Sequence, residues 1–301
     1  MMSRTRVKWD NAISEPVSLI SGVKQGGVLS PILLDTVLAE LEDSKLGCFI
    51  NRMCFNSFMY ADDLILISSS VSDLECMLKI CERIFIKLDM PVNLNKSHCI
   101  RIGPRFNAKC SSICLSDTPI NWVEEIDFLG IRLKSCKNFR CAWSGAKKKF
   151  FSSANAIVGK LGTKVANYVT LKLIYTNSIP ALMYGTIATG LDRKDISELS
   201  RAYDSIYAKI FKSFNKDVIL QCQYCSGFWP AEMFYKFHRF TFLDSLRRSG
   251  KISSKSVIDT PDCLEVKAIG KKYSICDEDS VNSIKYKFWR NFSKRIEMLQ
   301  K

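Results

Sequence analysis

The sequence lacks a secretory start and any apolar run of membrane-spanning length. Its first ten residues are polar and carry Arg4, Arg6 and Lys8, unlike the apolar centre of a signal peptide. No apolar run approaches the roughly 18 residues that a membrane-spanning helix needs. The 13 cysteines are scattered, mostly as single residues between apolar neighbours. We therefore expect an intracellular protein, nuclear or cytoplasmic, with free thiols and no membrane partner.

Zinc ligands are also sparse. Cys222 and Cys225 have the spacing of a zinc-ligand pair, and His238 and Cys263 lie downstream. A closed structural zinc site needs four ligands, usually two pairs, and the second pair is missing. Packing of these side chains is therefore favoured over zinc binding.

One long stretch lacks acidic residues altogether. Residues 132–191 contain ten Lys or Arg and no Asp or Glu, whereas residues 35–89 contain ten acidic and five basic residues. The net charge of +14 suits a nucleic-acid partner, although by itself it suits a basic protein without one equally well. The uneven distribution predicts an acidic part that could hold metal ions, followed by a basic part that could hold phosphates.

The apolar pattern predicts an α+β fold. Extended segments are expected at Val17–Ile20 (after a turn at Trp9–Asn11), Phe58–Tyr60, Leu64–Ile67 and Val92–Ile102, the last interrupted at Asn95–Ser97. A second hairpin is expected around Trp122–Leu133. Helices are expected from Ser30-Pro31, from a capping box at Ser72–Glu75, from Ser144, over Thr170–Ile179, over Asp192–Phe214 and over Ile284–Leu299. Strands with packed helices therefore come first, and a helical part follows.

Two adjacent acids stand at the tip of one predicted hairpin. Asp62 and Asp63 follow Tyr60-Ala61 and lie between the two apolar runs. Like charges this close repel each other, and a divalent cation removes that cost. Polymerase chemistry uses two such cations to activate a 3′ hydroxyl and to stabilise the leaving pyrophosphate. The alternative is an ordinary surface turn, in which Asp is common.

A glycine-containing loop precedes this hairpin. Gln25, Gly26 and Gly27 lie between Lys24 and a helix start at Ser30-Pro31. Glycines let a backbone approach a nucleotide closely. An ordinary strand-to-helix turn explains the same residues without a ligand.

The order and spacing of these segments resemble the later palm motifs of reverse transcriptases, in particular those of non-LTR (LINE-type) retrotransposons. Gln25 to Pro31 resembles the segment that contacts template and dNTP. Tyr60-Ala61-Asp62-Asp63 resembles the catalytic signature. Asn95-Lys96-Ser97 is similar to the segment whose lysine lies near the incoming triphosphate, and Phe128-Leu129-Gly130 resembles the primer grip. These motifs cover roughly residues 17–214.

The resemblance implies a role for each matched residue. Asp62 and Asp63 would bind metal, and together with Lys96 they would be the catalytic residues. Gln25, Gly26, Gly27, Tyr60 and Ala61 would contact the nucleotide or template, and Phe128, Leu129 and Gly130 would form the primer grip. The implied cofactor is Mg²⁺ in a two-metal site, and the implied partners are an RNA template, a DNA primer and dNTPs.

The sequence departs from the family at its beginning. In the family, the first metal-binding Asp lies on a strand well upstream of the glycine loop, but only 24 residues precede Gln25 here. Asp10 lies in a hairpin turn too close to the loop to replace it. We therefore expect an incomplete metal site, little or no polymerase activity by this chain alone, and a longer polyprotein or a degenerate copy as its source.

Lysines cluster after the palm-like part. Lys147, Lys148, Lys149, Lys160 and Lys164 lie on or after the first predicted helix of the basic stretch, among aromatic residues. Such lysines can follow the phosphates of a template–primer duplex without reading bases. The alternative is a solvated helix face.

These observations predict an α+β chain with a partial polymerase palm, an antiparallel sheet with packed helices, followed by an α-helical thumb. The predicted division is residues 1–135 for the palm, 136–248 for the thumb and 249–301 for a C-terminal extension of unknown role. The predicted function is RNA-directed DNA polymerase. The alternatives are a non-catalytic nucleic-acid-binding remnant of such an enzyme and an intron-encoded maturase.

Overall fold

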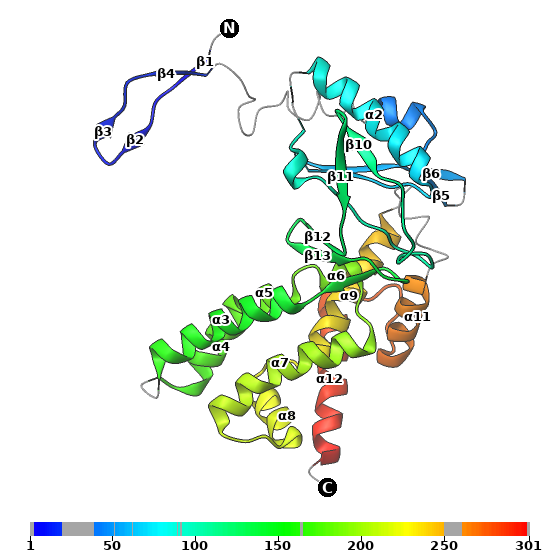
Figure 1. The fold of residues 1–301 in the computed structure, drawn as a ribbon. Coiled ribbons are helices and arrows are strands. Elements are labelled where there is room, and N and C mark those ends of the chain that lie inside the picture. Colours follow the sequence, from blue (N-terminus) through cyan, green and yellow to red (C-terminus); the bar gives the residue numbers. More distant parts are fainter. Residues whose placement is uncertain are drawn as a thin grey trace. The chain divides into compact units, whose positions relative to one another are not determined.

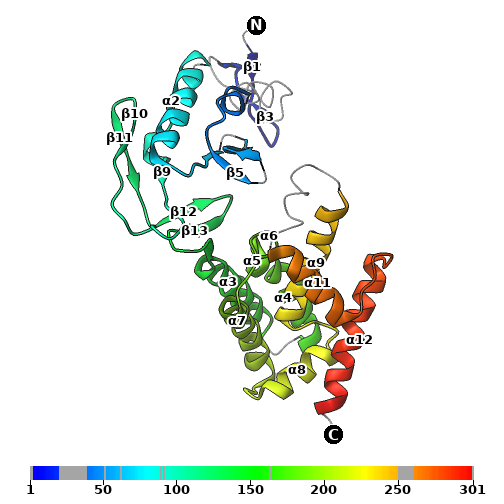
Figure 2. The ribbon, with the colours of Figure 1, turned by 90° about the vertical axis from the view of Figure 1, so that its right-hand side faces the viewer.

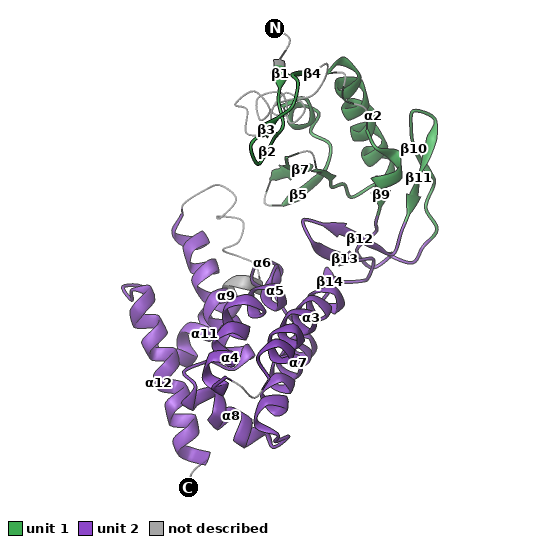
Figure 3. Cartoon of the chain, turned by 90° about the vertical axis from the view of Figure 1, so that its left-hand side faces the viewer, with its two compact units in different colours: residues 1–99, 109–122 green, residues 100–108, 123–301 purple. Residues whose placement is uncertain are grey.

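The computed structural model describes residues 3–19, 39–50, 52–61, 63–88, 90, 92–162, 165–249 and 261–299. Within these residues the chain is α+β, as predicted, with short and mostly antiparallel sheets first and helices after them (Figure 1). Two compact units are distinguished (Figure 3): unit 1 comprises residues 1–99 and 109–122, and unit 2 comprises residues 100–108 and 123–301. None of the described helices has both the length and the apolar character that crossing a membrane requires.

Unit 1 begins with a narrow β-ribbon. Its strands are β1 (Ser3–Thr5), β2 (Lys8–Trp9), β3 (Ala12–Ile13) and β4 (Val17–Leu19). β1 pairs with β4, and β2 pairs with β3 around the predicted turn, in which Asp10 has a left-handed φ of 49°. The side chains of Val7, Trp9 and Ile13 are all exposed.

The rest of unit 1 packs short hairpins and one helix around a small core. Its elements are β5 (Cys48–Ile50), β6 (Met53–Phe55), β7 (Ser57–Tyr60), β8 (Asp63–Leu66), α2 (Val71–Lys87), η1 (Leu94–Lys96), β9 (His98–Cys99), β10 (Ile113–Leu115) and β11 (Thr118–Trp122). β10 pairs antiparallel with β11, and β11 pairs parallel with β9. The core contains Leu41 and, from α2, Met77, Cys81 and Ile84.

Helix α2 begins earlier than the sequence predicted. Ser70 is its N-cap, because the Ser70 side chain accepts a hydrogen bond from the Asp73 backbone N–H at 3.0 Å. The predicted capping box at Ser72–Glu75 is therefore wrong, although the helix itself is confirmed. The stretch has several serines, and the side-chain oxygen of Ser70 is the one that reaches an unsatisfied N–H of the first turn.

Unit 2 starts with a three-stranded antiparallel sheet and continues as helices. The sheet has the order β12 (Glu125–Phe128), β13 (Ile131–Lys134) and β14 (Arg140–Ala142). The helices are α3 (Ser144–Leu161), α4 (Asn167–Asn177), α5 (Ile179–Met183), α6 (Thr186–Thr189), α7 (Arg193–Phe211), α8 (Lys216–Cys225), α9 (Ala231–Arg248), α11 (Pro261–Tyr273) and α12 (Val281–Leu299). Helices α3 and α7 begin within a residue of the predicted starts.

The first helical core joins α3, α4, α5 and α7. Phe150 and Ala154 of α3 are fully buried and lie one helical turn apart. The Tyr203 and Tyr207 hydroxyls of α7 form a hydrogen bond of 3.0 Å, which satisfies both polar groups inside the core. The predicted second helix ends before Pro180, as expected, but Pro180 lies in the first turn of the short helix α5.

A second core joins α8, α9, α11 and α12 (Figure 2). Tyr273 of α11 stacks on Phe288 of α12 with ring centroids 3.7 Å apart, and Trp229 lies edge-on to Phe237 at 4.9 Å. Helix α11 was not predicted, because its segment is polar with weak periodicity. The part of residues 249–301 that the structure describes is thus packed into the helical unit. The predicted domain boundaries at 135 and 248 otherwise stay a prediction.

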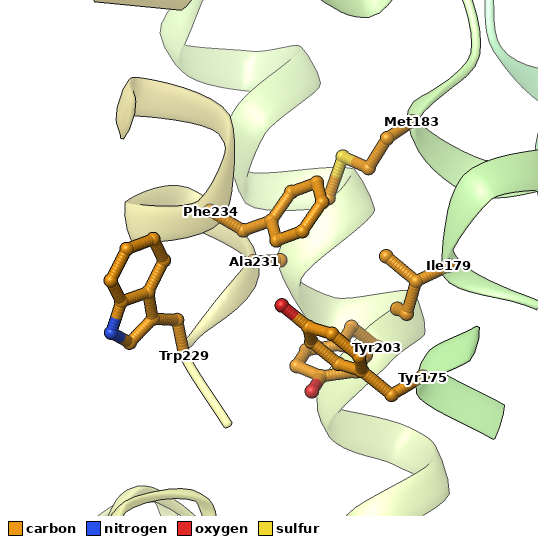
Figure 4. Close-up of a pocket in the computed structure, with 7 residues that line it drawn as sticks. All are labelled: Tyr175, Ile179, Met183, Tyr203, Trp229, Ala231 and Phe234. Carbon is orange, nitrogen blue, oxygen red and sulfur yellow. The ribbon is translucent and has the colours of Figure 1, made fainter. Parts of the chain in front are cut away.

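Figure 4 shows a small crevice between α4, α5, α7 and the start of α9. Tyr175, Met183, Trp229 and Phe234 are among its lining residues, and Tyr175 stacks on Phe228 at 4.7 Å. None of the lining side chains is charged. The crevice therefore offers neither the cations nor the carboxylates that a nucleotide or metal site needs.

Candidate functional site

The β7–β8 hairpin has the predicted form. Its register pairs Phe58 with Ile65 and Tyr60 with Asp63, which leaves a two-residue tip at positions 61 and 62. Leu64 and Leu66 pack against the core of unit 1. Because side chains alternate across a strand, Tyr60 and Asp63 share the opposite face with Phe58. That face is open: Tyr60 is 64% exposed.

The hairpin tip holds its backbone in an unusual conformation. Ala61 has a φ of 53°, in the left-handed region that non-glycine residues rarely adopt. A two-residue loop between antiparallel strands requires a positive φ, because only such turns match the strand twist. The geometry therefore places the start of β8, with the Asp63 carboxylate, directly beside the Tyr60 ring.

Several predicted site residues lie outside the described residues. They are Gln25, Gly26, Gly27, Asp62 and Lys164. The predicted nucleotide-contacting loop and the first acid of the tip therefore stay predictions.

Lys96 ends the short 3-10 helix η1 and is exposed. Among the described residues, no ion pair joins it to Asp63. No group of three or more His, Cys, Asp or Glu in the described part of the chain lies close enough to hold a metal ion. The described residues by themselves do not form a metal site, and because Asp62 lies outside them, the predicted site is not tested.

The predicted primer-grip residues form a tight turn in unit 2. Phe128 pairs with Ile131, and Leu129 and Gly130 between them have φ values of 48° and 76°. Two successive positive φ values are typical of a type I′ hairpin turn. The three residues are thus brought together at a hairpin tip, on a different unit from Asp63.

Residues between helices α5 and α6 of unit 2 contact this turn. The Tyr184 hydroxyl donates a hydrogen bond to the Leu129 carbonyl oxygen at 2.8 Å. Gly185 lies so close to Ile131 that an added Cβ would stand 2.6 Å from its Cδ1 atom. Sequence reasoning missed Tyr184 and Gly185. A glycine between two helical segments was the only signal, and it gave no indication of the partner.

An ion pair stiffens the same hairpin. The Arg132 guanidinium donates to both Asp127 carboxylate oxygens, at 2.8 and 2.7 Å. These hydrogen bonds lower the pKa of Asp127, and the positive charge of Lys149 lowers it further. Because both side chains are largely exposed, solvent screening leaves the pair a modest contribution to stability. Its main effect is to hold the two strands in register.

Two cations of the basic residues 132–191 form ion pairs that the sequence did not indicate. Arg140 pairs with Asp192 at 2.7 Å, and Lys147 pairs with Glu198 at 2.8 Å. Both acids come from the start of α7, outside the acid-free residues 132–191. The pair with Lys147 lowers the pKa of Glu198. Lys147 therefore holds α3 to α7, and its predicted role as a phosphate contact is weakened without being tested.

The remaining predicted lysines of α3 are available to solvent. Lys148, Lys149 and Lys160 are exposed, and no ion pair of theirs occurs among the described residues. They can approach phosphates without first breaking a salt bridge.

The residues with zinc-like spacing do not gather in the described structure. Cys222 and Cys225 lie on α8, while the His238 ring of α9 packs against Phe234 with centroids 4.2 Å apart. Burial and the nearby Lys285 lower the pKa of His238. His238 thus has the environment of a packed ring, as the favoured packing interpretation expects, and zinc binding by Cys222 and Cys225 is not tested.

Comparison with known proteins adds a family match. Residues 3–133 match the family described as "Reverse transcriptase (RNA-dependent DNA polymerase)". The chain is also 26% identical over 148 residues to the "Retrovirus-related Pol polyprotein from type-2 retrotransposable element R2DM" of Drosophila melanogaster. That alignment covers 46% of this chain but 14% of the relative. The predicted resemblance is confirmed, and the chain spans a small part of the relative's length.

Proposed function

We propose that this chain, whose residues 3–133 match the reverse transcriptase family, is part of an RNA-directed DNA polymerase of the non-LTR retrotransposon type. In the intact enzyme it would help to add dNTPs to a primer 3′ end on an RNA template. The observation that carries this proposal is the β7–β8 hairpin, which presents Asp63 opposite Tyr60 at a two-residue tip. The alternative of a surface turn does not explain why this hairpin falls inside the family match.

We propose that the catalytic metal is Mg²⁺ and that Asp62 and Asp63 supply part of its ligands. A two-metal site needs a further carboxylate that bridges both ions. No described residue of this chain provides it next to Asp63. We expect loss of a metal ligand to lower the rate by orders of magnitude, each tenfold loss corresponding to about 1.4 kcal/mol of barrier. The chain alone is therefore expected to have little or no activity, and an upstream segment of a longer polyprotein is expected to complete the site.

The proposed partners follow from the same reading. The open face of the hairpin would lie near the primer terminus and the incoming dNTP. The exposed Lys148, Lys149 and Lys160 would contact the phosphates of the template–primer duplex. We also propose an intracellular location, nuclear or cytoplasmic. It is supported by the free state of the 12 cysteines whose side chains the structure describes and by burial of the Cys81 thiol, whose pKa rises to about 11.

Primer extension tests the proposal. The 301-residue chain is compared with a longer polypeptide from the same reading frame that includes the upstream segment, using an RNA template, a DNA primer, dNTPs and Mg²⁺. We expect extension by the longer polypeptide, none by the chain alone, and loss of extension in the longer Asp63→Asn variant. Asp117→Asn is the matched control, because Asp117 is an exposed turn acid of the same unit with a left-handed φ of 58°, a conformation that Asn adopts readily.

The result separates the alternatives. Extension that persists in the Asp63→Asn variant would remove the catalytic assignment. Salt-sensitive duplex binding by the longer polypeptide without any synthesis would favour the non-catalytic remnant.

A further inference from the structure

Phe214 is the most exposed of the large apolar side chains that the structure describes, with 91% of its surface open to solvent. It lies in the connection between α7 and α8. Burying a phenylalanine side chain contributes roughly 1.5–3 kcal/mol, so an uncovered ring leaves that contribution unused in this chain. A single exposed apolar side chain is common on protein surfaces, so the case for Phe214 depends on its ordered turn and on the lysines beside it.

The backbone around Phe214 is held in place by side chains. Lys212 ends α7 in the left-handed conformation, with a φ of 54°. The Ser213 hydroxyl accepts a hydrogen bond from the Asn215 N–H at 3.3 Å, and the Asn215 side chain caps α8 by accepting from the Asp217 N–H at 2.8 Å. These contacts fix the turn on both sides of Phe214. The ring is therefore presented outward by an ordered turn.

Three lysines lie within five residues of Phe214 in the sequence. Lys212 and Lys216 flank Phe214 two residues away on each side, and both are exposed. Lys209, also exposed, donates a hydrogen bond to the Asn155 side chain at 3.0 Å. Two acids belong to the same neighbourhood: Asp217 is exposed in the first turn of α8, while Asp204 is half-buried and accepts from Gln223 at 2.7 Å. Three lysines thus accompany one exposed carboxylate.

The turn lies far from the hairpin that carries Leu129 and Gly130. Asp192, the N-cap of α7, is tied to β14 by its ion pair with Arg140. Helix α7 has 19 residues and is therefore about 28 Å long. Phe214 follows the C-terminal end of α7, and Figure 2 shows the connection from α7 to α8 at the end of the helices away from β12 and β13. A ligand bound at the Phe214 turn would therefore occupy a different place on unit 2 from a ligand at the Leu129-Gly130 hairpin.

We propose that Phe214 is a stacking site for an unpaired base of single-stranded RNA, with Lys212 and Lys216 contacting the adjoining phosphates. The combination of an aromatic face and flanking cations fits a nucleotide, since every base has a face to stack and every linkage carries a charge. A stable protein partner needs a buried area of about 1,000 Å² or more, which a single ring does not supply. The inference rests on the proposed function only in taking RNA as the nucleic acid that this chain handles.

Binding of the full chain to a 12-nucleotide single-stranded RNA and to a blunt RNA–DNA duplex tests the proposal. We expect Phe214→Ala to weaken binding of the single strand about tenfold, the usual size of one lost stacking contact. Phe214→Trp should bind the single strand as tightly as wild type does, because it keeps an aromatic face. Phe214→Leu keeps an apolar side chain without a ring and should bind as weakly as Phe214→Ala. Duplex binding should be unchanged in all three. Leu264→Ala is the control, because Leu264 is 68% exposed elsewhere in unit 2.

Each other outcome counts against the stacking site. Equal binding of the single strand by wild type and Phe214→Ala would overturn it, as would full restoration by leucine. Binding to vesicles of anionic lipid that depends on Phe214, without an effect on RNA, would assign the turn to a membrane surface. If wild type binds neither probe, the proposed function fails too, whereas a failure confined to the Phe214 variants leaves the proposed function standing.

Discussion

Arg239 gives the sharpest prediction about the stability of the helical unit. Its side chain is 2% exposed, and its guanidinium donates to the backbone oxygens of Ile187 and Ala188, at 2.7 and 3.1 Å, and to Glu265 at 3.2 Å. The two carbonyls belong to the last turn of α6, and the carbonyls of a helix's last turn have no N–H partner within the helix. Arg239 therefore joins α6, α9 and α11.

The change Arg239→Met keeps most of the side-chain length and removes every donor. Each backbone oxygen left without a partner in a buried place costs about 1–3 kcal/mol, and Glu265 loses its cation. The apolar replacement does not remove those acceptors, so it lacks the compensation that replacing a whole buried ion pair can bring. We expect the free energy of unfolding to fall by about 3–5 kcal/mol, a large share of the total for a domain.

Urea unfolding followed by circular dichroism at 222 nm measures this change, because the signal comes mainly from the helices of unit 2. Arg290→Met is the matched control: Arg290 is exposed on α12, and its loss should change stability by less than about 0.5 kcal/mol. If Arg239→Met lost no more than the control, the buried contacts of Arg239 would be replaceable by water and the reasoning would fail.

Three further outcomes are expected. Tyr184→Phe removes the bond to Leu129 and should destabilise unit 2 by about 0.5–1 kcal/mol, with faster hydrogen exchange in the β12–β13 hairpin; unchanged exchange there would contradict it. Ala61→Gly relieves a φ of 53° and should stabilise unit 1 by about 0.5–1 kcal/mol in thermal unfolding; a loss of stability would refute the strained turn. The pKa of Asp279 is lowered by hydrogen bonds from Lys287 and neighbouring groups. Ionised Asp279 therefore adds to the free energy of unfolding fully above about pH 4, and this contribution is lost as pH falls below that value. Asp279→Asn should flatten the acid limb of a plot of urea midpoint against pH, and an unchanged limb would argue against it.

The local elements were predictable because short-range rules determine them. Two short apolar runs on either side of Asp62-Asp63 predicted the β7–β8 hairpin. The predicted helix start at Asp192 agrees with the structure, in which the Asp192 side chain caps α7. The β10–β11 hairpin was missed, since Ser116 and Asp117 adopt left-handed φ values without a glycine to signal a turn. Such a turn is stable here because the buried Ile113 and Ile120 hold its strands together.

The pairing of charges could not be predicted from the sequence. The stretch without acids suggested a row of free cations, but the partners of Arg140 and Lys147 are 52 and 51 residues away in the chain. Only the packing of α7 against α3 and β14 brings them together. For the same reason the support of Leu129 by Tyr184, 55 residues later, left no local trace in the sequence.

The packing of α11 and α12 also limits how short a working copy of this gene can become. A reading frame that stopped after codon 249 would leave Phe237 and Phe240 of α9 facing water, and Arg239 would have no carboxylate from α11. Chaperones and proteases act on chains that expose such surfaces. We therefore expect a copy truncated there to be less stable and more readily degraded than the full chain.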